Sequence, residues 1–160
     1  MADTTYLRRI VETYVRDQLS REFGQTFSAR FLSLQPGGRH EFDAVSEDRG
    51  VVASIKAASG LTAGGRNPSG KIKDCIAAEL YYLSLVEAPI RRLVLTTPAF
   101  FAIFAKSTAG AVARGIEVVC VPLPTELQLE VDKIVLAASR EVSPGRAIAA
   151  VAAEIESGTE

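Results

Sequence analysis

Two short apolar runs separated by a polar turn constrain the fold of this chain more than any other feature. The runs span residues 42–45 and 51–57, and the segment between them is SEDRG. Apolar runs that flank a short polar turn are typical of an antiparallel β-hairpin. The stretch from Arg39 to Ser59 is therefore expected to form two paired strands that lead into the rest of the fold.

Charged side chains of this hairpin occupy positions where strands seldom carry them. Side chains alternate between the two faces of a strand, so Glu41 and Asp43 share one face, while Ser54 and Lys56 share one face of the next strand. If the residues that close the turn pair with each other, Asp43 lies opposite Ser54 and Glu41 opposite Lys56. Such a cluster is either an exposed cross-strand ion pair or a site for a hard cation such as Mg²⁺.

Apolar spacing and turn residues predict the remaining elements. We expect helices over residues 4–23, 71–86, 99–114, 126–140 and 146–155, and further strands over residues 27–34, 93–97 and 116–123. The strand, helix and strand between residues 93 and 123 favour a parallel crossover. The 160 residues suit one α/β domain, with a mixed central sheet of about five strands flanked by helices. We expect its core over residues 5–123, followed by a C-terminal helical extension over residues 125–157.

Composition narrows the location and the partners. No apolar run reaches membrane-spanning length, and the start of the chain leads into a charged helix, so we expect a cytoplasmic protein with no membrane association. A net charge of −1 argues against nonspecific binding of nucleic acid, but a local basic patch can still contact phosphates. Arg66, Lys71 and Lys73 would form that patch.

Two further features of the sequence could belong to a binding or catalytic site. The segment GRNPSGKI, residues 65–72, has the G-x-x-x-x-G-K spacing of a phosphate-binding loop. It places Ile72 where Mg²⁺-binding Ser or Thr belongs, and a loop separates it from the preceding strand, so nucleotide binding is the weaker alternative. His40 is the only histidine, and a His-based metal site or a Ser/His/Asp triad would depend on it alone. We assign it no catalytic role, although its place beside Glu41 leaves a supporting role open.

The order of a helix, three strands, a helix and a strand, with an acid and a lysine on the central hairpin, resembles the PD-(D/E)XK, or restriction-endonuclease-like, nuclease superfamily. Asp43 takes the position of the motif Asp, and Ser54-Ile55-Lys56 that of (D/E)-x-K. HEFD, residues 40–43, is similar to the G-E-I-D of the resolvase-like branch, whose first helix supplies a Glu that Glu12 could match. The resemblance covers residues 5–123 approximately and depends mainly on the order of the elements.

This resemblance implies a metal-dependent endonuclease that hydrolyses DNA phosphodiester bonds. Asp43 with Glu41 or Glu12 would hold Mg²⁺ or Mn²⁺. Lys56 would orient the attacking water or neutralise the phosphate. DNA is the expected partner, and a homodimer is compatible with the sequence.

Ser54 departs from the family pattern, because a neutral hydroxyl is a weaker ligand for Mg²⁺ than a carboxylate. Glu41 on the same hairpin or Glu79 on the second helix could supply the missing acid. Without such compensation, the domain would be a catalytically inactive nuclease-fold module that binds DNA or another protein. The sequence leaves this choice open.

Overall fold

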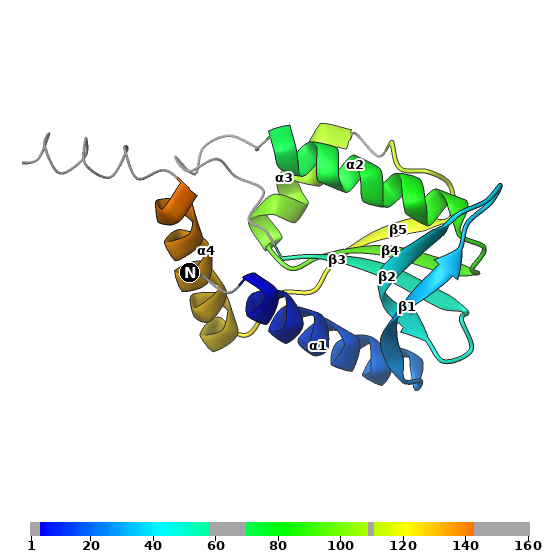
Figure 1. Ribbon diagram of the computed structural model, residues 1–160, viewed down its shortest axis with the longest axis horizontal. Coiled ribbons are helices and arrows are strands. Elements are labelled where there is room, and N and C mark those ends of the chain that lie inside the picture. Colours follow the sequence, from blue (N-terminus) through cyan, green and yellow to red (C-terminus); the bar gives the residue numbers. More distant parts are fainter. Residues whose placement is uncertain (1–3, 58–69, 109–110, 143–160) are drawn as a thin grey trace, which may run out of the picture. The chain divides into compact units, whose positions relative to one another are not determined.

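A computed structural model describes residues 4–57, 70–108 and 111–142 of the chain (Figure 1). The observed order of elements follows the predicted one. The elements are α1 (Thr4–Phe23), β1 (Phe27–Ser33), β2 (Arg39–Ser46), β3 (Val51–Lys56), α2 (Gly70–Leu85), β4 (Ile90–Leu95), α3 (Pro98–Thr108), β5 (Ile116–Cys120) and α4 (Thr125–Val142). Most of the GRNPSGKI segment and the helix expected over residues 146–155 lie outside the described residues.

The strands form one mixed sheet, which confirms the predicted α/β class. Five strands lie in the order β1-β2-β3-β4-β5. β2 is antiparallel to both β1 and β3, whereas β3, β4 and β5 are parallel to one another. The predicted crossover is confirmed, because α3 joins the parallel strands β4 and β5.

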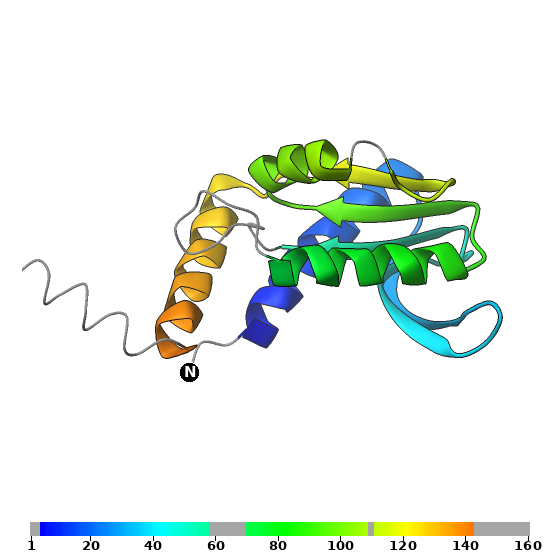
Figure 2. The same ribbon diagram turned by 90° about the horizontal axis from the view of Figure 1, so that it is seen from above.

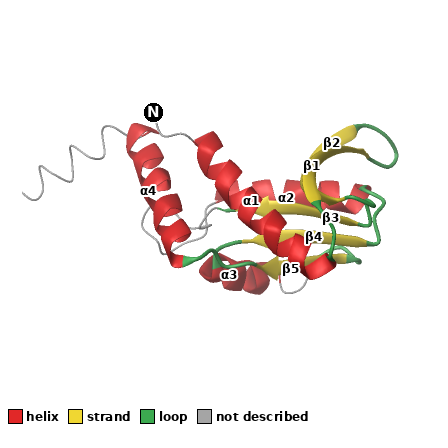
Figure 3. Cartoon of the chain, turned by 90° about the horizontal axis from the view of Figure 1, so that it is seen from below, coloured by secondary structure: helices red, strands yellow, loops and turns green. Residues whose placement is uncertain are grey.

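Helices cover both faces of this sheet. α1 lies on one face, and α2 and α3 lie on the other (Figures 1 and 3). The stripe of α1 that faces the sheet consists of Val11, Val15 and Leu19, which recur at the four-residue helical spacing and are almost completely buried. On the opposite face, Phe42 and Leu83 belong to the main apolar core, which includes side chains of β2, β3, β4, α2 and α3. Burial of each large apolar side chain contributes about 1.5–3 kcal/mol to stability.

The β2–β3 pairing has the predicted register, but it is short. Ala44 pairs with Ala53, and Val45 with Val52. Beyond them the β1–β2 hairpin bends away from β3 (Figure 3), and Glu41 pairs only with β1 and is exposed. The predicted position of Glu41 opposite Lys56 is therefore not realised.

Several element boundaries differ from the prediction: β5, for example, ends at Cys120 rather than residue 123. Two of the differences have a local physical reason. α3 ends at Thr108 rather than Arg114, and the Thr108 hydroxyl donates to the carbonyls of Phe104 and Ala105 in the last turn. β4 begins at Ile90 rather than Leu93, because Ile90 N donates to the carbonyl of Gly50 and extends the parallel ladder. Arg91 of β4 bonds to backbone carbonyls at the end of α2, and Arg92 pairs with acids of α1 and β5.

The chain divides into two compact units. One spans Val11–Leu123 and holds the whole sheet; the other combines residues 1–10 with residues 124–160, of which 4–10 and 124–142 are described. Every residue of the candidate site lies in the first unit. No helix in the described ranges is both long and apolar enough to cross a membrane.

Candidate functional site

The carboxylate of Glu79 is the centre of a polar cluster under α2. Lys56, the last residue of β3, places its Nζ 2.8 Å from Glu79 Oε1. His40 of β2 places its Nε2 3.7 Å from the other oxygen, Oε2. The cluster forms because α2 runs along one face of the sheet (Figure 2), and its Glu79 contacts Lys56 of β3 and His40 of β2 there.

Glu79 is ionised in this setting. Burial of its carboxylate by itself raises the pKa, but the hydrogen bond and the positive charge of Lys56 outweigh that effect, so the pKa of Glu79 lies below its usual value of 4.5. The nearby Ser54 hydroxyl and His40 lower the pKa further. A half-buried anion with a paired lysine is therefore present at neutral pH.

Ser54 contributes a buried hydroxyl beside this pair. Its side chain is 1 % exposed. The Oγ makes no hydrogen bond of good geometry, although it lies close enough to Glu79 to affect the pKa of that carboxyl. Buried hydroxyls usually have a hydrogen-bond partner, and the Glu79 carboxylate is the polar group that this hydroxyl influences.

Asp43 lies on β2 directly before Ala44, where the pairing of β2 with β3 ends. Its Oδ2 accepts a hydrogen bond from Ile55 N at 2.8 Å. Its backbone carbonyl accepts one from Arg16 Nε at 2.7 Å, and Arg16 also binds the carboxylate of Glu12 at 2.7 Å. The Asp43 side chain therefore accepts the hydrogen bond of a β3 backbone N–H, and Arg16 of α1 holds the backbone of Asp43 in place.

The predicted metal ligands do not come together as a set. In the part of the chain that the structure describes, no three His, Cys, Asp or Glu side chains form a group that could hold a metal ion. Asp43, Glu41 and Glu12 are consequently not gathered at one point: Glu41 is exposed, and Glu12 is paired with Arg16. Glu79, which the sequence analysis named as an alternative source of the missing acid, does form an ion pair with Lys56.

The predicted phosphate contacts are only partly placed. Lys71 and Lys73 lie in the first turns of α2, and their side chains are not described. Arg66 lies outside the described residues.

Among the described residues, Asp43 and Glu79 are the two acids whose carboxylates contact β3, and no group of three possible metal ligands accompanies them. Mg²⁺ retains several waters and is commonly held by one or two carboxylates together with phosphate oxygens of a substrate. Asp43 contacts Ile55, and Glu79 contacts the adjacent Lys56, so the two acids reach neighbouring residues of β3. The Ser54 oxygen lies on the same strand.

His40 is the residue of the cluster that sequence reasoning missed. Face alternation places Glu41, rather than His40, beside Lys56, because it assumes that β2 is regular. The β1–β2 register shifts between Ser28 and Arg30, so β2 carries one extra residue between Phe42 and Val45, and this β-bulge exchanges the faces of the residues before it. The pairing of His40 with Leu32, a partly buried side chain that packs on the core, agrees with a position facing α2.

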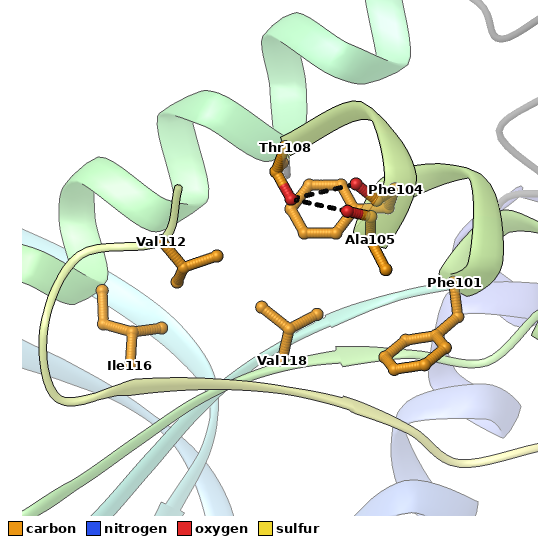
Figure 4. Close-up of a pocket in the computed structure, with 7 residues that line it drawn as sticks. All are labelled: Phe101, Phe104, Ala105, Thr108, Val112, Ile116 and Val118. Atoms are coloured by element: carbon orange, nitrogen blue, oxygen red, sulfur yellow. Dashed lines mark hydrogen bonds between the residues drawn. The ribbon is translucent and has the colours of Figure 1, made fainter. Parts of the chain in front are cut away.

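A separate pocket lies between α3 and β5 (Figure 4). It has a volume of about 280 Å³ and is lined by Phe101, Phe104, Ala105, Thr108, Val112, Ile116 and Val118. Thr108 is the only polar side chain among the described lining residues, and its hydroxyl bonds to the backbone of α3. The lining carries no charge and offers nothing for phosphate chemistry.

Comparison of the chain with protein-family models, characterised proteins and solved structures finds no match. The side chains of the Glu79 cluster and the order of the elements are therefore the features of the molecule that bear on its function.

Proposed function

We propose that this protein is a nuclease-like hydrolase of DNA phosphodiester bonds, similar to the PD-(D/E)XK superfamily, in which Glu79 supplies the acid that is missing at Ser54. The 2.8 Å contact between Lys56 and Glu79 is the observation that supports this most directly. It joins the motif lysine to an acid from the second helix. The order of elements, a helix, three antiparallel strands, a helix and a strand, also agrees with the resemblance.

Each residue has a distinct role in this proposal. Asp43 and Glu79 would hold Mg²⁺ or Mn²⁺, which supplies Lewis-acid polarisation of the phosphate and an activated water. Lys56 places a positive charge where negative charge develops on the phosphate. Because the Asp43 carboxylate is fixed by Ile55 N–H and Lys56 by Glu79, these groups need little reorganisation on binding DNA.

The surroundings of the site complete the proposal. Arg66, Lys71 and Lys73 are proposed to contact the DNA backbone, because these basic residues precede Glu79 closely in the sequence. A cytoplasmic location would give the protein access to DNA. A homodimer would let two sites act on the two strands.

The second candidate is a nuclease-fold module that binds DNA or a protein without cutting. The hydroxyl at Ser54 and the lack of a three-acid group among the described residues favour it. Nucleotide binding at the GRNPSGKI segment has no support from the described residues.

Cleavage of plasmid, linear, single-stranded and branched DNA with Mg²⁺ or Mn²⁺ tests the proposal. We expect Asp43→Asn, Lys56→Met and Glu79→Gln each to lower the cleavage rate by about 100-fold or more, the usual effect of removing one electrostatic contributor. Glu87→Gln is the matched control, because Glu87 is an exposed acid just beyond the end of α2. It is expected to cleave like the wild type.

Two results would change the assignment. A wild type that cuts no substrate with either metal, but retards DNA in a gel, supports the binding module. A Glu79→Gln variant with full activity, alongside an inactive Glu41→Gln, moves the second acid to the hairpin.

A further inference from the structure

The β1–β2 hairpin is attached to the rest of the fold through one of its two faces. On this inner face His40 pairs with Leu32, and the His40 ring is stacked on that of Tyr82, with centroids 3.9 Å apart. At the hairpin turn, Gln35 N donates to the carbonyl of Leu85 at the end of α2, at 2.8 Å. The helix α2 therefore holds the hairpin in position.

The outer face of the hairpin carries an exposed aromatic ring. Phe31 pairs with Glu41, and both side chains point to the face opposite His40. Ser33 and Arg39 form the next pair on that face. All four are exposed, and Phe31 is 57 % exposed. Because the hairpin curves away from the rest of the sheet (Figure 3), this face is open to a partner.

Arg39 adds a positive charge beside the ring. Its Cζ lies 5.7 Å from the centre of the Phe31 ring, within the range of a cation–π contact. Among the described residues, the Arg39 guanidinium forms no ion pair or hydrogen bond, so it is available to an anion. Residues 27–41 hold two arginines and one acid, although the whole chain has a net charge of −1. The outer face thus presents an aromatic ring together with a free cation.

This combination suits a nucleic-acid strand better than a protein. Bases stack on aromatic side chains, and arginine binds phosphates. Base faces inside a duplex are covered by the neighbouring base pairs, so a side chain such as Phe31 stacks on an unpaired base. Within the hairpin, all of which the structure describes, Phe31 is the only exposed large apolar side chain. One such side chain is too little for the core of a stable protein–protein interface.

We propose that the outer face of the β1–β2 hairpin is a second DNA contact, at which Phe31 stacks on an unpaired base and Arg39 binds the adjacent phosphate. The inference rests on the proposed function and names its substrate class, which is DNA that carries a single-stranded segment such as an overhang or a branch. Glu41 repels phosphate, so the phosphate lies on the Arg39 side of the ring. Because α2 already holds the hairpin, little conformational freedom is lost on binding.

Tryptophan fluorescence tests the stacking directly. The chain contains no tryptophan, so Phe31→Trp in the full chain places a single indole on the outer face. The probes are oligo-dT, a duplex with a single-stranded overhang, and relaxed closed-circular DNA, each in EDTA to prevent cleavage. We expect the first two to quench the emission and the circular duplex to leave it nearly unchanged. Tyr81→Trp is the control, because Tyr81 is 61 % exposed on α2 and should show little quenching.

Binding affinities separate the contributions of the two side chains. Phe31→Ala should weaken binding of oligo-dT by about 10-fold and that of circular duplex by less than about twofold. Phe31→Tyr keeps the ring and should bind like the wild type. Arg39→Gln should weaken both and lower the salt dependence of oligo-dT binding, the slope of log K against log salt, by about 0.7. Thermal unfolding and size-exclusion chromatography of each variant should match the wild type.

Three results would overturn the hairpin contact. The first is an unquenched Phe31→Trp in the presence of a strand that the protein binds. The second is an equal loss of affinity for oligo-dT and circular duplex in Phe31→Ala, which excludes an unpaired base. The third is a Phe31→Ala variant that changes from dimer to monomer with wild-type DNA affinity, which assigns this face to a second copy of the chain.

Failure of the proposed function gives a different pattern. A wild type that cuts no DNA, while oligo-dT quenches Phe31→Trp, overturns the hydrolase and supports the hairpin contact. A Phe31→Ala variant that cleaves branched and linear DNA with the wild-type preference overturns the hairpin contact and leaves the hydrolase intact. A wild type that binds no DNA overturns both.

Discussion

Ser46 and Ser54 are buried serines on neighbouring strands, and they are bonded very differently. Ser46 Oγ donates to Asp48 Oδ1 at 2.7 Å and accepts from Val51 N at 2.9 Å. Ser54 Oγ makes no hydrogen bond of good geometry, although it lies near the Glu79 carboxylate. The first hydroxyl closes the β2–β3 turn, whereas the second is not needed to hold the strands together.

This contrast predicts opposite effects of the same substitution. Ser54→Ala should leave the free energy of unfolding within about 0.5 kcal/mol of the wild type, because a hydroxyl that makes no hydrogen bond of good geometry is replaced by a methyl group. Ser46→Ala should cost about 1–3 kcal/mol, because it leaves Val51 N buried without a partner. Urea unfolding of both variants makes the comparison. An equal loss in the two would mean that the Ser54 hydroxyl is bonded in solution.

The hydrogen bonds of the Asp48 carboxylate should make a contribution to stability that depends on pH. Its carboxylate accepts hydrogen bonds from the Ser46 hydroxyl, Gly50 N and the Gln25 side chain, and these bonds hold its pKa below the usual 3.8. Since the folded state favours the ionised form, the contribution is complete above pH 3.8 and is lost as the pH falls through the lowered folded pKa.

We therefore expect the difference in urea midpoint between the wild type and Asp48→Asn to be largest at neutral pH and to shrink in acid. Asp17→Asn, at an exposed position of α1, is the control and should change the midpoint little at any pH. A difference for Asp48→Asn that stays constant with pH would contradict the role assigned to these hydrogen bonds.

At the scale of single residues, the sequence located the site only as far as local geometry allows. Asp43 and Lys56 stand out because charges on half-buried strands are uncommon. Glu79 could be named only as an alternative, since its approach to Lys56 depends on how α2 packs on the sheet. His40 was missed because the β-bulge in β2, which exchanges the faces of the residues before it, cannot be recognised from the alternation of side chains in the sequence.

Among the elements, the junction between α2 and β5 depends on one guanidinium and one glycine. Arg91 Nη1 donates to the carbonyls of Leu83 and Ser84 at the end of α2, and Nη2 donates to that of Arg114. Gly115 follows with φ +80°, and a Cβ there would lie 2.6 Å from Arg91 Nη2. A side chain at Gly115 would both strain the backbone and displace the cap of the helix.

Three glycine substitutions should form a graded series in stability. Gly37→Ala meets no atom within 4 Å and is expected to be neutral or slightly stabilising. Gly24→Ala is also unobstructed but must adopt φ +67°, which costs about 1 kcal/mol. Gly115→Ala should be the most damaging, at about 2 kcal/mol or more, because it combines strain with loss of the Arg91 contacts. Thermal and urea unfolding would reveal any other order.

For the molecule as a whole, the element order was predictable because apolar periodicity and turn residues agree along most of the chain. The start of β4 could not be predicted, because Arg91 and Arg92 occupy strand positions and interrupt the apolar pattern. Their partners, at the end of α2 and on α1 and β5, are distant in sequence. Local spacing carries no information about contacts of that kind.

Arg92 connects three elements in one place. It donates to both carboxylate oxygens of Glu22 in α1 at 2.9 Å and to Glu117 in β5 at 2.7 Å, and its guanidinium lies 4.8 Å from the centre of the Phe23 ring. Glu22 is 70 residues away in sequence and Glu117 is 25 away. The entropy of closing such loops delays these contacts during folding.

The consequence is kinetic. If the Arg92 contacts form after the rate-limiting step, Arg92→Met should accelerate unfolding and leave the refolding rate nearly unchanged. Ser46→Ala, which removes bonds local to one turn, is the comparison and should slow refolding if that turn forms early. Stopped-flow measurement of both limbs in urea distinguishes the cases, and slower refolding of Arg92→Met would place the junction inside the transition state. On the expected result, Arg92 sets how long the native state persists rather than how quickly it is reached.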